Sequence, residues 1–130
     1  MAESIGEIEQ QSAGSSNISS LVDQFVDGTV QLDCGASCSD TFAARRPAML
    51  AMYRSNDWVR LSREVVTIGY DQDLAWFYLG QSAQGLGLGD AAVKYYLYAM
   101  ETPSKCLDEM CDGFIFPERI ERQLSHMSVP

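Results

Sequence analysis

Four cysteines are the residues whose spacing most directly predicts chemistry in this chain. Cys34 and Cys38 form a C-x3-C pair, and Cys106 and Cys111 form a C-x4-C pair, with 67 residues between the two pairs. An even number of cysteines in a small domain is typical of disulfides. A glycine beside each pair favours a tight local loop, so we predict the bridges 34–38 and 106–111. The alternative joins the N-terminal pair to the C-terminal pair, and its longer loops stabilise by about 4 kcal/mol per bridge.

Paired cysteines also suggest two other kinds of chemistry. A Cys₄ zinc site would make the chain a metal-stabilised structural domain in the cytosol, but neither spacing is the C-x2-C usual in such sites. Catalytic thiol exchange usually needs C-x-x-C at a helix N-terminus, which neither pair has. Disulfides indicate an oxidising compartment, so we expect a periplasmic or cell-surface protein. The first 30 residues contain no secretory signal, so this location implies that a signal has been removed.

The sequence offers no group for enzymatic catalysis. The single histidine, His126, lies near an end expected to fray. The glycine-rich run at 85–89 follows a predicted helix rather than a strand and has no Lys-Ser/Thr after it, which argues against a phosphate-binding loop. We therefore expect a non-enzymatic protein with no catalytic residue, no metal and no cofactor.

Charge divides the 130-residue chain into two parts. Nine basic and 18 acidic residues give a net charge of −9, which disfavours a nucleic acid as partner. Residues 1–44 contain seven acids and no Lys or Arg, whereas the rest of the chain is nearly balanced. Residues 1–17, acidic and rich in Ser and Gln, are predicted to be a flexible leader or tether. The alternative is an acidic first helix, because Ile5 and Ile8 are three residues apart. Residues 18–130 would then form a single domain, and no apolar run is long enough to span a membrane.

Apolar spacing predicts helices through most of that domain. A short helix from about Ser19 should precede an extended segment at 29–33, where apolar and polar residues alternate. Further helices are expected at 39–53, at 58–68, from about 71 to the glycines at 85–89, and at 91–100. Pro47 should kink the first of these or mark its first turn, and Pro117 should begin a short final helix.

Residues 73–99 carry a pattern of large and small residues at fixed spacing: Trp76, Leu79, Gly80, Gly87, Ala92, Tyr96 and Ala99. This pattern resembles a tetratricopeptide repeat, a 34-residue helix–turn–helix, within a repeat at about 73–104. Gly80 and Ala92 should lie where the antiparallel helices touch, because a larger side chain would push them apart. Residues at about 42–69 resemble a second, degenerate repeat. The expected fold is all-α, with tetratricopeptide-like antiparallel helix hairpins, a short C-terminal capping helix and disulfide-bracketed ends.

The resemblance also implies a function. Tetratricopeptide proteins bind other proteins on a concave face formed by the first helix of each pair, which on this chain gives Leu74, Phe77, Gln81 and Gln84. The tyrosines of the following helix, Tyr95 and Tyr98, are added because tyrosine is enriched at interfaces. An apolar peptide segment would suit this surface. We therefore expect a protein–protein interaction module, an accessory or adaptor subunit of a cell-envelope assembly.

Overall fold

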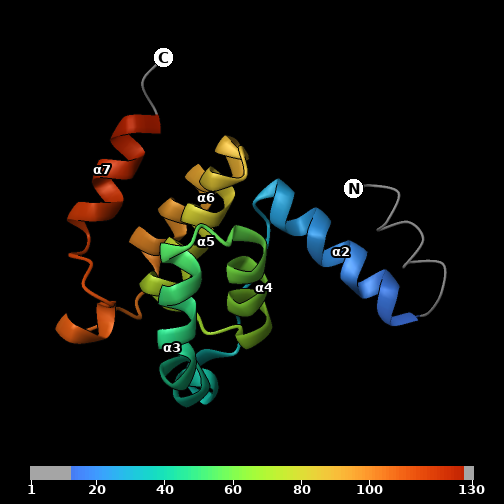
Figure 1. Cartoon of the computed structure of the whole chain (residues 1–130), viewed down its shortest axis with the longest axis horizontal. Helices are drawn as coiled ribbons and strands as arrows, with labels where there is room; N and C mark the ends of the chain where they lie inside the picture. The colour runs from blue at the N-terminus through green and yellow to red at the C-terminus, as the bar shows by residue number, and fades with distance from the viewer. Residues whose placement is uncertain (1–12, 128–130) are drawn as a thin grey trace.

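The computed structural model describes residues 13–127, whose regular secondary structure is helical, with no strand among them (Figure 1). The elements follow one another as α2 (Ala13–Asp27), η1 (Gly35–Cys38), α3 (Ser39–Arg54), α4 (Trp58–Ile68), α5 (Asp73–Gly85), α6 (Gly89–Glu101), η2 (Asp108–Cys111) and α7 (Glu118–Met127). The all-α prediction is confirmed. Among the described residues, no helix is both long and apolar enough to cross a membrane.

Local sequence signals explain where the central helices begin and end. Gly69 ends α4 in the left-handed conformation (φ 74°), and its N–H bonds to the carbonyl of Val65. Aspartates lie in the first turns of α3, α5 and α6, where they complement the helix dipole. Pro47 lies inside α3 rather than in its first turn, and α3 continues through it to Arg54.

The central helices form two pairs, and α5 belongs to one pair and packs against the other. α5 forms an antiparallel hairpin with α6, and α4 packs against α5 and pairs with α3 (Figure 1). Every side chain of α5 from Asp73 to Ala83 is buried, so this helix is the centre of the core. Paired helices of this kind are compatible with a helical repeat fold.

Gly80 lies at a close contact between α5 and α6. A Cβ built on it would lie 2.4 Å from Cε1 of Tyr96, far inside van der Waals contact. Ala92 of α6 is fully buried. Space therefore requires the small residue expected at position 80, and the small residue expected at position 92 is buried.

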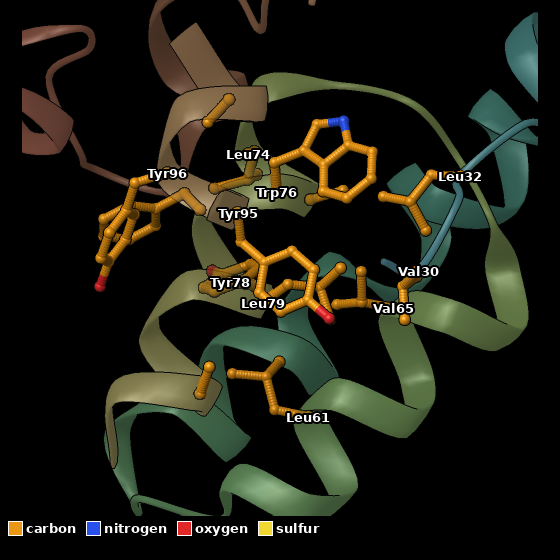
Figure 2. Close-up of a cluster of buried hydrophobic side chains, with 14 of the residues drawn as sticks. Val30, Leu32, Leu61, Val65, Leu74, Trp76, Tyr78, Leu79, Tyr95 and Tyr96 are labelled. Carbon is orange, nitrogen blue, oxygen red and sulfur yellow. The ribbon is translucent and has the colours of Figure 1, made fainter. Parts of the chain in front are cut away.

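The N-terminal arm reaches the core through an extended segment. α2 leans away from the helical body (Figure 1), and its C-terminal end is anchored to α6 by stacking of Phe25 on Tyr95. Residues 29–33 then run along the body, with Val30 and Leu32 buried as the alternation predicts (Figure 2). The predicted helix start at Ser19 is wrong, because α2 begins at Ala13 and includes the end of the predicted leader; residues 1–12 of that leader lie outside the described residues.

Both predicted disulfides are confirmed. Cys34 is bonded to Cys38, with Cα atoms 5.9 Å apart, and Cys106 to Cys111, with Cα atoms 5.4 Å apart. Bridges joining the two ends of the chain are therefore wrong. The Cys₄ zinc alternative needs four converging thiolates, whereas the four cysteines form two separate local bridges.

Candidate functional site

The predicted binding face of α5 is largely covered by the chain itself. Leu74 and Phe77 are fully buried and Gln81 is 9% exposed, whereas Gln84 is exposed. The ring of Phe77 packs against Phe114 and Phe116, with centroids 4.7 and 5.1 Å away. Leu74, Phe77 and Gln81 therefore offer a partner little or no accessible surface in this structure. For Phe77, the physical reason is that two aromatic side chains of the C-terminal segment already occupy that surface.

The C-terminal segment, residues 112–119, is held to the helical body by polar contacts at both ends. Tyr78 donates a hydrogen bond to Asp112 Oδ2 (2.6 Å), and Arg46 lies 3.4 Å from Asp112 Oδ1. Burial, reinforced by the Asp112 carboxylate, raises the pKa of Tyr78, so this hydroxyl remains a donor. At the other end, Arg119 donates to the Tyr53 hydroxyl (3.1 Å) and its guanidinium lies over Phe114.

The two glutamines of the predicted face fix a tyrosine of α6. Gln81 Nε2 donates to the Tyr96 hydroxyl (2.7 Å), which in turn donates to Gln84 Oε1 (2.6 Å). Tyr96 is fully buried, and burial raises its pKa. These three side chains therefore form a hydrogen-bond chain that holds α5 and α6 together, and Gln84 is its exposed end.

The predicted tyrosines of α6 have different positions. Tyr95 is fully buried and donates to the carbonyl of Phe25 (2.7 Å), so it offers no accessible surface to a partner. Its contact instead fixes α2 to the body. Tyr98 is half-buried and lines an open groove on the side of α6 that faces the extended segment. Of the six predicted partner-binding residues, Gln84 and Tyr98 keep accessible surface.

We call this feature the acidic groove. It has a volume of about 630 Å³ and lies between residues 29–33 and the adjoining ends of α5 and α6. Trp76 and Tyr98 contribute its aromatic surface, with ring centroids 5.0 Å apart. Three carboxylates line it, those of Asp33, Asp71 and Glu101.

Two hydrogen bonds orient one of these carboxylates. Trp76 Nε1 and the Thr102 hydroxyl each donate to the same oxygen of Asp71, Oδ1, at 2.8 Å. The other oxygen has no hydrogen-bond partner within residues 13–127. Asp71 therefore presents a fixed acceptor without a large cost of ordering.

Sequence reasoning missed the groove carboxylates and Trp76 as a site. Two features of the sequence indicate such a site: the acidic stretch 1–44, which has no Lys or Arg, and the alternating segment 29–33. The tetratricopeptide resemblance instead predicts binding on a different face of α5. Only the return of the extended segment across α5 and α6 brings Asp33 near Asp71 and Glu101.

A second cavity, of about 570 Å³, lies beside the C-terminal disulfide. Asp73 lines it, 3% exposed, and accepts the backbone N–H groups of Leu74 and Cys106 at 2.8 and 2.9 Å. Burial raises the pKa of Asp73 above its usual value. The nearby amine, Lys105 Nζ, donates to the carbonyls of Ala99 and Met100. These contacts join the start of α5 to the C-terminal disulfide loop and so stabilise the fold.

Within the described part of the chain, no group of three or more His, Cys, Asp or Glu side chains converges as a metal would require. His126 lies exposed on α7. Comparisons of the chain with protein-family models, with curated proteins and with solved structures find no match in any of the three.

Proposed function

We propose that this protein is a non-enzymatic, tetratricopeptide-like protein–protein interaction module that holds a partner polypeptide in the acidic groove. The observation that carries the proposal is the groove itself. It is open, it is walled by a backbone segment and two aromatic rings, and it is large enough for several residues of a bound chain.

The tetratricopeptide-like character is supported by the helix pairs and by the close contact at Gly80. The partner would not use the face formed by Leu74 and Phe77, because residues 114 and 116 cover Phe77 there. It would bind beside Tyr98, on the side of the α5–α6 hairpin that the N-terminal extended segment borders.

We further propose that the module acts in an oxidising compartment, in the periplasm or at the cell surface, as an accessory or adaptor subunit of an envelope assembly. Two disulfides in a chain of this size support that compartment, because thiols in the cytosol are kept reduced. Free thiols in protein isolated from its native compartment would contradict this location.

Site-specific photo-cross-linking in the producing cells tests the interaction. A photoreactive amino acid replaces Gln31, which is exposed and lines the groove, and in a matched control replaces Leu86, exposed at the α5–α6 turn and outside the groove. We expect a discrete polypeptide adduct from position 31 and none from position 86. Equal yields at the two positions, or no adduct at 31, would refute the proposed binding site.

A further inference from the structure

We propose that the acidic groove binds a cationic, extended segment of its partner, with lysine or arginine side chains between the aromatic rings and the three carboxylates. This inference rests on the proposed function and adds to it the chemistry of the bound segment. It follows from the charge of the groove, from the separation of its carboxylates, from its aromatic surface and from the free backbone of its wall.

The groove carries uncompensated negative charge. The ion pairs of the described residues join Arg45 to Glu64, Arg46 to Asp112 and Arg60 to Asp57, and none includes a carboxylate of the groove. Among residues 13–127, no Lys, Arg or His lines it. In a chain with a net charge of −9, this groove attracts a cationic partner and repels an anionic one.

The three carboxylates do not converge as three ligands of one metal ion would. Asp33, Asp71 and Glu101 line one groove, yet they do not form a group that could share a metal among the described residues. They come from three separate elements: the extended segment, the α4–α5 connection and the end of α6. Such spacing suits several cationic groups along a chain better than one cation.

The aromatic surface suits the long side chains of lysine and arginine. Tyr98 is half-buried at the groove, and the neighbouring Trp76 is held by its hydrogen bond to Asp71. Trp76 is 6% exposed, so Tyr98 is the ring on which a lysine or arginine stem can pack while its charged end reaches a carboxylate. The ring and the carboxylates therefore recognise different parts of the same side chain.

The wall of the groove has backbone groups that are available for hydrogen bonds. Thr29 N–H bonds to the carbonyl of Gln24 and Cys34 N–H to that of Gly69, which fixes the segment at both ends. Between them, the backbone N–H and C=O groups of residues 31–33 make no hydrogen bond within the described residues. An extended peptide can pair with such a segment as an added strand, so we infer an extended partner rather than a helical one.

Peptide binding tests the inference. The probe is a labelled peptide of about ten residues that alternates lysine and threonine, and its control replaces each lysine with glutamate. Fluorescence anisotropy measures both against the full chain at about 50 mM and about 500 mM NaCl. We expect the lysine peptide to bind, with affinity that falls as salt rises, and the glutamate peptide not to bind.

Matched neutral variants distinguish the effect of the groove carboxylates from that of the net charge of the chain. Asp33→Asn with Glu101→Gln removes two groove charges, while Asp90→Asn with Glu118→Gln removes two exposed charges that do not line it. We expect about fivefold weaker binding for the first pair and less than twofold for the second. Equal losses, or binding of the glutamate peptide, would overturn the cationic inference. Adducts at position 31 would still support the interaction module, so the two failures are distinguishable.

Discussion

Replacing Gly80 with alanine measures how closely α5 and α6 pack. The new Cβ would lie 2.4 and 2.5 Å from Cε1 and Cδ1 of Tyr96, whereas carbon atoms in contact are about 3.5–4.0 Å apart. The Tyr96 ring would have to move by roughly 1 Å. It is fully buried, and Gln81 and Gln84 hold its hydroxyl, so it cannot rotate away freely.

The expected magnitude follows from two opposing effects. Overpacking a well-filled core costs about 1–3 kcal/mol, and alanine gains about 1 kcal/mol over glycine in helix propensity. We expect a net loss of up to about 2 kcal/mol for Gly80→Ala. The larger Gly80→Leu adds further atoms to the same space and should unfold the domain.

Urea unfolding followed by circular dichroism is the assay, and Gly89→Ala is the control. Gly89 begins α6, and a Cβ there meets nothing within 4 Å, so its replacement should leave stability unchanged or slightly raised. With a slope of about 1–3 kcal/mol per molar urea, the Gly80→Ala midpoint should fall by about 1 M or somewhat less. When Tyr96 is also replaced with leucine, the stability lost through Gly80→Ala should be about 1 kcal/mol smaller. Equal effects at positions 80 and 89 would refute the reasoning.

Three further predictions concern the C-terminal half. Burial raises the pKa of Asp73, so the folded state binds its proton more tightly than the unfolded state, and its contribution to stability is lost as pH rises through the folded pKa. Asp73→Asn keeps the Oδ1 acceptor but does not titrate. The parent should therefore lose free energy of unfolding relative to the variant as pH rises from about 4 to about 7, and a relative gain would contradict this. Replacing Cys106 and Cys111 with alanine should cost about 2 kcal/mol in urea unfolding, because the bridge closes a short loop; an unchanged midpoint would argue against it. Phe114→Ala should cost about 2 kcal/mol and increase binding of a hydrophobic dye, whereas Ile115→Ala, at a side chain 71% exposed, should change neither; similar losses for both would contradict the packing described.

Local patterns in the sequence predict most of the helical framework. The Trp58, Leu61 and Val65 spacing predicts α4, and Gly69 ends it in the left-handed conformation that favours glycine. The expected close contact at Gly80 is also present, although it is made with Tyr96 rather than with a small residue. These features depend on neighbours along the chain or on one helix crossing, and short-range patterns carry that information.

The binding surface could not be predicted in the same way because it depends on long-range returns of the chain. Phe114 and Phe116 lie in a short stretch between a disulfide and a helix, and nothing in their spacing indicates that they cover Phe77. Asp33 and Glu101 are 68 residues apart in sequence, and only the path of the extended segment brings them to one groove. The apolar pattern of α5 reports burial but not which part of the chain supplies it.

The packing of α7 on α6 limits the addition of further helix pairs to this fold. In a solenoid each new helix pair stacks on the last helix of the pair before it, which here is α6. That flank is occupied by α7, whose Ile120 is 1% exposed and whose Leu124 packs on the same core. A further helix pair cannot stack on this flank of α6 unless α7 first detaches.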